Sequence, residues 1–257
     1  RAFGDAPDHL SQVMQGHRDV GATLVGDPRV ALISATGSTA MGRKVGQVAA
    51  SRFARTILEL GGNNAQIISD KADVALALRG VLFSAFGTTG QRCTSLRRLF
   101  VHDSLYDSFV PALTAAAASM PIGDPLDTAH LAGPLIDEAA YAGMQQALEE
   151  AKALGGMISG GERLPGVGVY VRPAIVEIAA QEGPVLRETF APILYVMRFA
   201  DLDEAIALQN AVGAGLSSSI FSTDIRECER FLSAAGSDCG IANVNIGTSG
   251  AEIGGAF

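Results

Sequence analysis

The chain contains 257 residues, of which 48% are hydrophobic and 18% charged, and its formal net charge is −8. This apolar content is enough for a sizeable core and excludes intrinsic disorder. We find no basic run, which argues against a nucleic-acid partner. We also find no signal peptide and no apolar stretch near about 18 residues, which argues against a membrane segment. Three scattered cysteines suggest neither a disulfide scaffold nor a metal site, and they favour a cytoplasmic protein.

Both ends of the sequence look like breaks within a longer chain. The sequence opens on Arg1, and it closes on Gly-Gly-Ala-Phe257 without a polar tail. We therefore expect a fragment that lacks both of its neighbouring segments.

The first third of the chain alternates strand and helix patterns. Residues 30–34 form a short apolar run, which is typical of a strand buried on both faces of a parallel sheet. A helix is predicted over 40–52, and a second strand over 56–60. That strand closes on a turn at 61–64. This order of elements predicts an α/β protein with a domain boundary near residue 60.

The rest of the chain continues in the same manner. Asp70 is the predicted N-cap of a helix that ends at Gly87. The other predicted helices cover 104–120 and 137–154, and two more start at 201–204 and 224–227. In each of these two starts, the acid three residues after the cap, Glu204 or Glu227, is expected to accept a hydrogen bond from the N–H of the cap residue. The predicted strands cover 98–102, 170–178, 193–199 and 241–245.

One cysteine stands in a setting that favours reactivity. Cys93 follows a glycine-rich loop and stands beside Arg92. A guanidinium and loop N–H groups favour the thiolate, which is the nucleophilic form. A small buried hydrophobe is the alternative interpretation, and it is the one we adopt for Cys228 and Cys239.

A glycine–serine pair and two acids are the other candidates for chemistry. Gly37 and Ser38 stand between a predicted strand and a helix, where N–H groups either hold a phosphate or simply cap the helix. Glu59 lies in an apolar strand end, so its carboxylate is either paired or kept for function. Glu188 is either functional or a surface acid beside Arg187.

The order of these motifs resembles that of the NAD(P)-dependent aldehyde dehydrogenase superfamily. The motifs are Thr36-Gly-Ser-Thr, Glu59-Leu-Gly-Gly, Gly90-Gln-Arg-Cys93 and Glu188-Thr-Phe-Ala-Pro. Two further segments, Leu60-Gly-Gly-Asn-Asn64 and the run from Gly236 to Gly255, are similar to the antiquitin branch. Members of that branch oxidise α-aminoadipic semialdehyde, which is in equilibrium with piperideine-6-carboxylate, in lysine degradation.

The resemblance implies a role for each candidate residue. Cys93 would attack the aldehyde to give a thiohemiacetal and then a thioester, and Glu59 would activate the water that hydrolyses it. Arg92 would pair with a substrate carboxylate. The implied cofactor is NAD, with NADP not excluded, and its expected contacts are Gly37, Ser38, Leu60, Gly61, Glu188 and Phe190. The remaining expected substrate contacts, in an aldehyde-anchor loop, are Thr248, Ser249, Gly250 and Ala251. No metal is implied.

The resemblance also implies an architecture for the whole chain. Residues 1–59 would be the C-terminal half of a Rossmann-like NAD-binding domain, and 60–247 the catalytic domain. Residues 248–257 would be the anchor loop and the start of the return to the cofactor domain. A homo-oligomer, a dimer or a tetramer, is expected of the full-length protein.

Three alternatives stay open at this point. Another semialdehyde dehydrogenase or a betaine-aldehyde dehydrogenase would use the same scaffold. A cysteine hydrolase would use Cys93 without a cofactor, although no histidine stands at an evident base position. A catalytically silent fragment is the third, because the adenine pocket and the oxyanion-hole asparagine of the family have no counterpart here. We expect no NADH formation from the 257 residues alone.

Overall fold

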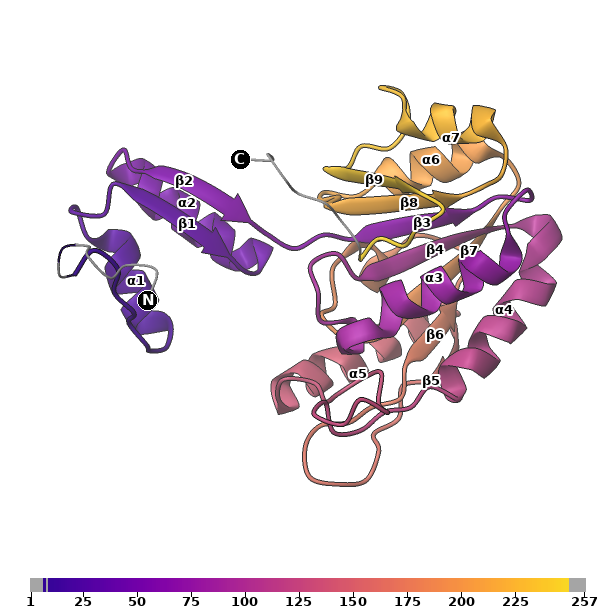
Figure 1. Cartoon of the computed structure of the whole chain (residues 1–257), viewed down its shortest axis with the longest axis horizontal. Helices are drawn as coiled ribbons and strands as arrows, with labels where there is room; N and C mark the ends of the chain where they lie inside the picture. The colour runs from indigo at the N-terminus through magenta and orange to yellow at the C-terminus, as the bar shows by residue number, and fades with distance from the viewer. Residues whose placement is uncertain (1–6, 8, 250–257) are drawn as a thin grey trace. The chain divides into compact units, whose positions relative to one another are not determined.

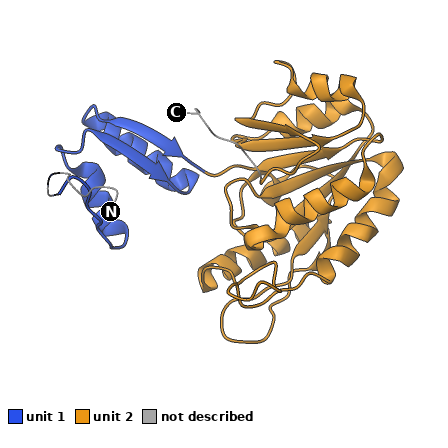
Figure 2. Cartoon of the chain, viewed as in Figure 1, with its two compact units in different colours: residues 1–60 blue, residues 61–257 orange. Residues whose placement is uncertain are grey.

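The computed structural model describes residues 7 and 9–249 and divides the chain into two compact units (Figure 1, Figure 2). Unit 1 is Arg1–Leu60 and unit 2 is Gly61–Phe257. Unit 1 has one small hydrophobic core, and unit 2 has two larger ones. Among the described residues, no helix is long and apolar enough to cross a lipid bilayer.

The described residues of unit 1 form two helices and a two-stranded parallel sheet. Its elements are α1 (Arg18–Gly26), β1 (Leu32–Thr36), α2 (Thr39–Ser51) and β2 (Arg55–Glu59). The strands pair with Thr36 opposite Glu59, so their carboxyl ends meet at the start of α2. Helix α1 was not predicted from the sequence. The first strand lies two residues later than predicted, and Ile33 is its one buried residue, so burial on both faces was wrong for the part of the chain described here.

Unit 2 is built on a seven-stranded sheet with the order β5-β6-β7-β4-β3-β8-β9. Strand β5 pairs antiparallel with β6, and the other pairings are parallel. The strands are β3 (Asn64–Ile68), β4 (Leu96–His102), β5 (Met157–Gly160), β6 (Ala174–Glu177), β7 (Ile193–Phe199), β8 (Ser217–Phe221) and β9 (Ile241–Val244). The helices are α3 (Val74–Phe86), α4 (Asp103–Ala118), α5 (Glu138–Ala153), α6 (Leu202–Asn210) and α7 (Ile225–Leu232), with 3-10 turns η1 (Gly87–Gly90) and η2 (Gly183–Leu186).

The sheet of unit 2 is covered on both faces, as an α/β fold requires. Helices α3 and α4 pack on one face with the strand residues of one core cluster (Figure 1). Helices α5, α6 and α7 contribute to the cluster on the other face. Alternate residues of the central strands enter opposite clusters, as Tyr195 and Val196 of β7 do.

Several predicted boundaries differ from the structure. Helix α3 is capped by Asp73, whose carboxylate accepts the Leu76 N–H at 3.0 Å, whereas Asp70 accepts the Ser69 hydroxyl in the preceding turn. The predicted strand over 170–178 is confined to Ala174–Glu177, because Pro173 has no N–H to donate to a ladder.

The predicted starts of α6 and α7 are confirmed, but the expected return bond of Glu227 is wrong. Asp201 and Asp224 accept N–H groups of the first turns of α6 and α7, and Asp137 does the same for α5. The Glu227 carboxylate instead accepts hydrogen bonds from Ser69 and from Ser222. It therefore ties α7 to the carboxyl ends of β3 and β8.

Candidate active site

The candidate residues of unit 2 gather at the amino ends of three neighbouring parallel strands. Gly61 precedes β3, Cys93 precedes β4, and Glu188 precedes β7. Strand β4 lies between β3 and β7 in the sheet, so the three loops are adjacent. Ligands of open α/β sheets usually bind at the carboxyl ends of the strands. In this chain the candidate residues lie instead in the loops at the amino ends of the strands.

The turn before Cys93 is left-handed over three consecutive residues. Thr88, Thr89 and Gly90 have φ values of 57°, 56° and 66°. For a residue with a Cβ this conformation costs about 1–2 kcal/mol, so the turn needs support from elsewhere. The Thr89 hydroxyl donates to the Gly133 carbonyl at 2.8 Å. A side chain at Gly90 would overlap the backbone of Ala191, so this position admits only glycine.

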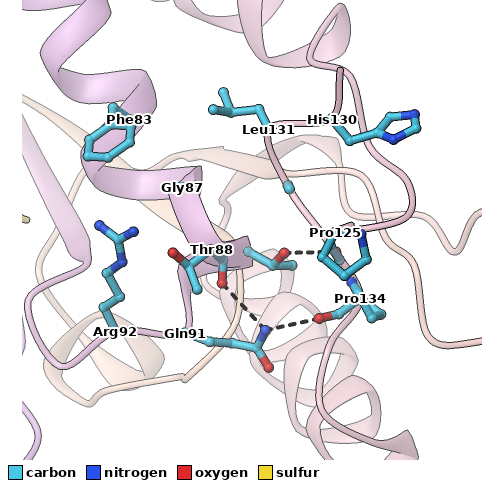
Figure 3. Close-up of a pocket in the computed structure, with 12 residues that line it drawn as sticks. Phe83, Gly87, Thr88, Gln91, Arg92, Pro125, His130, Leu131 and Pro134 are labelled. Carbon is cyan, nitrogen blue, oxygen red and sulfur yellow. Dashed lines mark hydrogen bonds between the residues drawn. The ribbon is translucent and has the colours of Figure 1, made fainter. Parts of the chain in front are cut away.

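Gln91 holds the same turn against the neighbouring segment (Figure 3). Its amide nitrogen donates to the carbonyls of Thr88, at 3.4 Å, and Pro134, at 3.1 Å. Its amide oxygen accepts the Ile136 N–H at 2.9 Å. The side chain thus fixes the backbone two residues before the candidate nucleophile.

Asn64, at the start of β3, fixes the backbone of Cys93 itself. The buried Asn64 amide donates to the carbonyls of Cys93, at 2.7 Å, and Ser95, at 2.8 Å. Its oxygen accepts the Ser217 N–H at 2.9 Å. Cys93 is half-buried and free, whereas burial raises the pKa of the Cys228 thiol inside α7. The structure therefore presents Cys93 on a braced loop and shields Cys228.

Glu188 is paired with an arginine from β4 and not with its sequence neighbour. Arg187 pairs with Glu150, whereas a Glu188 oxygen lies 3.6 Å from the buried guanidinium of Arg97. Burial raises the pKa of Glu188, and the Arg97 charge and the Gly62 N–H oppose that shift. The interpretation of Glu188 as a surface acid beside Arg187 is therefore wrong.

Gly61 and Phe190 stand next to this carboxylate. A Cβ at Gly61 would overlap the second oxygen of Glu188, so the carboxylate lies directly against the backbone there. The Phe190 ring lies 5.5 Å from the guanidinium carbon of Arg97 and is 46% exposed. These two predicted cofactor contacts and Glu188 thus share one place in unit 2.

Arg92 lines a cavity of about 410 Å³ (Figure 3). Its guanidinium carbon lies 5.3 Å from the centroid of the Phe83 ring. Thr88, Gln91 and His130 are among the other lining residues, and Cys93 is not. A cation held on an aromatic wall of an open cavity is suited to an anionic ligand group.

The hydroxyls of the anchor-loop residues are used inside the protein. Thr248 is fully buried, and its hydroxyl donates to the Thr94 carbonyl at 2.8 Å. Ser249 donates to the same carbonyl and to that of Ser84, both at 3.3 Å. This loop is thereby tied to the residue after Cys93. The other two predicted residues, Gly250 and Ala251, lie outside the described residues.

Unit 1 brings its own candidate residues together at the start of α2. The Gly37 N–H donates to the Glu59 carbonyl at 3.0 Å, and the Ser38 hydroxyl oxygen caps α2 by accepting the Met41 N–H at 3.1 Å. The Leu60 side chain leaves no room for a Cβ at Gly42 of α2. Within the described part of unit 1, the Glu59 carboxylate has no hydrogen-bond or ion-pair partner.

The sequence analysis missed two residues that organise the site. Asn64 was noted only as part of a motif, and Arg97 was not considered at all. The signal for Arg97 was available, because Arg97 and Arg98 interrupt an otherwise apolar strand. A charge in the middle of a buried strand must be paired or hydrogen-bonded, and both arginines are.

Comparison with known proteins decides the family. The model of the Aldehyde dehydrogenase family matches residues 2–257. The chain belongs to the aldehyde dehydrogenase family. Aldehyde dehydrogenase family 7 member A1 of Pisum sativum is 46% identical over 252 residues, 98% of this chain and 50% of that protein. Alpha-aminoadipic semialdehyde dehydrogenase of Mus musculus is 47% identical over 253 residues, 98% of this chain and 47% of that protein.

This aldehyde dehydrogenase chain thus spans about half the length of the curated relatives it matches. Betaine aldehyde dehydrogenase of Staphylococcus aureus, solved in complex with NAD+, is similar with a TM-score of 0.84. The two are 30% identical, and the match covers 88% of this chain and 46% of that one. The predicted family resemblance and the aldehyde dehydrogenase fold are confirmed.

Proposed function

We propose that this chain carries the nucleophile of an NAD-dependent dehydrogenase that oxidises α-aminoadipic semialdehyde to the carboxylate, a step of lysine degradation. The observation that carries the proposal is the free, half-buried Cys93 on a turn braced by Gln91 and Asn64. The name of the Mus musculus relative supports the substrate. The name of the Staphylococcus aureus structure supports aldehyde oxidation and NAD.

Cys93 is the proposed catalytic nucleophile. Its thiolate adds to the aldehyde carbon, which gives a thiohemiacetal whose oxyanion the Cys93 N–H would hold. Asn64 holds the Cys93 carbonyl, and Arg97 holds the Arg92 carbonyl, which lies in the same peptide group as that N–H. Loss of hydride from the thiohemiacetal leaves a thioester on Cys93, and Glu59 then takes a proton from the water that hydrolyses it.

The residues around Glu188 fit the ribose of a nicotinamide cofactor. The buried Glu188 oxygen that lies 3.6 Å from the Arg97 guanidinium has no hydrogen-bond partner among the described residues, so it keeps the capacity to accept from a ribose hydroxyl. Gly61 adds an open backbone beside it, and Phe190 a half-exposed ring. In unit 1, Gly37 and Ser38 would hold the pyrophosphate at the start of α2, beside Leu60. NAD+ bound there supplies the acceptor for the hydride.

Substrate selection is assigned to Arg92 and the anchor loop. Arg92 would pair with the carboxylate of the amino-acid end of the semialdehyde, since its guanidinium faces an open cavity. Thr248 and Ser249 would act by holding the loop that carries Gly250 and Ala251, because their hydroxyls are engaged by Thr94.

Assembly and location are proposed on the same basis. A homo-oligomer, a dimer or a tetramer, is the state proposed for the full-length enzyme. The three cysteines, all free, support a reducing compartment, and we propose the cytoplasm.

A substrate panel tests the proposal. An enzyme of the relatives' length that contains this sequence should form NADH from α-aminoadipic semialdehyde, with a kcat/KM at least about tenfold above those for betaine aldehyde and hexanal. The Cys93→Ala variant should form none, while it still binds NAD+. A preference for betaine aldehyde would contradict the proposed substrate, and full activity of Cys93→Ala would contradict the proposed chemistry.

A further inference from the structure

We propose that Arg97 is a positioning residue that couples the cofactor carboxylate Glu188 to the turn that presents Cys93. This inference rests on the proposed function and deepens it. It concerns how one side chain of β4 joins the two halves of the site, and it assigns no contact between Arg97 and the substrate or the cofactor.

Arg97 contacts both loops with the same guanidinium. One terminal nitrogen donates to the Gly90 carbonyl at 2.7 Å and to the Ala191 carbonyl at 3.1 Å. The other donates to the Arg92 carbonyl at 3.1 Å and lies 3.6 Å from a Glu188 oxygen. The two carbonyls in the nucleophile turn stand on either side of Gln91, just before Cys93. Arg97 therefore links that turn to the Glu188 loop through hydrogen bonds and an ion pair.

The pairing of Arg97 with Glu188 is secluded from solvent. The Arg97 side chain is 2% exposed, and burial lowers its pKa to about 10, which leaves it cationic near neutral pH. Glu188 is the one carboxylate that lies within ion-pair distance of Arg97 among the described residues. The bonds to the Gly90 and Arg92 carbonyls place the same guanidinium against the turn that leads to Cys93. The cation thus contacts a carboxylate in one loop and backbone carbonyls in the other.

Lysine should not substitute for Arg97. The acceptors are three carbonyls from two loops and a carboxylate, and they lie around a planar group with fixed donor directions. The ammonium of lysine supplies charge but lacks this planar fork and its stacking against Phe190. The charge and the geometry of Arg97 can therefore be separated by experiment.

The neighbouring Arg98 is a matched control. It is as deeply buried as Arg97, and it bonds to the carbonyls of Asn63, Leu208 and Gln209 and to the Gln181 side chain. No ion pair or hydrogen bond joins Arg98 to Glu188 or to the Cys93 turn among the described contacts. A general loss of packing should thus follow from either Arg97→Met or Arg98→Met.

The coupling is tested by two measurements that do not depend on catalytic turnover, both made on an enzyme of the relatives' length. The first is the NAD+ dissociation constant by calorimetry. Arg97→Met should raise it about 10- to 100-fold, Arg97→Lys should not restore it, and Arg98→Met should leave it within about threefold of wild type. The effects of Arg97→Met and Glu188→Gln on this constant should not add, because both substitutions remove the same interaction, the pairing of Arg97 with Glu188.

The second readout is the pH dependence of Cys93 alkylation by iodoacetamide without cofactor. Arg97→Met should shift the curve to higher pH, because the thiolate loses a nearby cation. Glu188→Gln should shift it to lower pH, because the same cation is then less neutralised. Arg97→Lys should stay near wild type. These opposite shifts are not expected of two changes that merely loosen the fold.

The outcomes separate this inference from the proposed function. Unchanged NAD+ binding and alkylation in Arg97→Met would overturn it, as would equal losses in Arg97→Met and Arg98→Met. If Arg97→Met does not fold, Glu188→Gln decides alone, and an unshifted alkylation curve would overturn the coupling. A wild-type enzyme that binds no NAD+ would instead contradict the proposed function, and its alkylation curves would still report on Arg97.

Discussion

Glu59→Gln should convert the full-length enzyme into one that makes a single burst of NADH and then stalls. The variant retains Cys93 and Glu188, so the thioester should still form, but it lacks the proposed base for the activation of water. General-base catalysis contributes about 10²- to 10⁴-fold, and the steady-state rate should fall by that factor. Stopped-flow measurement of NADH, with the burst compared with the concentration of active sites, checks this expectation.

Glu188→Gln is the matched control for that experiment. It also replaces a carboxylate by an amide, but at the ribose site, so the burst itself should be slow and the later rate should not be limited by hydrolysis. Glu59 has no partner within the described part of unit 1, whereas Glu188 is paired with Arg97. Identical traces from the two variants would mean that at least one of these roles is wrongly assigned.

Arg92→Ala should cost the full-length enzyme its preference for a substrate with a carboxylate. A hydrogen bond to a charged group contributes about 1.5–3 kcal/mol, so kcat/KM for α-aminoadipic semialdehyde should fall about 10- to 100-fold. Hexanal gives the guanidinium nothing to pair with and should be affected much less. Steady-state kinetics with the two aldehydes measures the difference.

Arg92→Lys separates the charge of Arg92 from its position beside Phe83. The lysine variant keeps the cation and should recover part of the preference, since one ammonium pairs with a carboxylate less well than a planar fork does. Equal losses with both aldehydes in Arg92→Ala would show that Arg92 holds the Cys93 turn and does not select the substrate. The cavity that Arg92 lines would then have another role.

The fold could be predicted where burial follows an apolar pattern. Strand β7 has the predicted bounds, and helices α2 and α5 lie within about one residue of theirs. Strands β3 and β8 were missed, although they are fully buried, because they read Asn-Ala-Gln-Ile-Ile and Ser-Ser-Ser-Ile-Phe. Asn64 of β3 and the serines of β8 bond to neighbouring segments, as Ser217 does to the Thr248 carbonyl. Hydropathy alone does not reveal a strand of this kind.

The candidate site was likewise predicted only in part. Motifs located Cys93 and Glu188, because each has a recognisable run of neighbours in the sequence. The side chains that hold them were not found, because the bonds of Asn64 and Arg97 join segments far apart in the chain. The direction of the Thr248 hydroxyl was also beyond the sequence, since only the folded loop places it on Thr94.

The central claim, covalent catalysis by Cys93 in aldehyde oxidation, is tested most directly by the mass of the enzyme after one turnover. The Glu59→Gln variant, treated with α-aminoadipic semialdehyde and NAD+ and quenched in acid, should carry one acyl group, and peptide mapping should place it on Cys93. Omission of NAD+ should leave the protein unmodified, because a thiohemiacetal reverts on quenching. An acyl group on Cys228 or Cys239, or NADH formation without any acylated Cys93, would contradict the account.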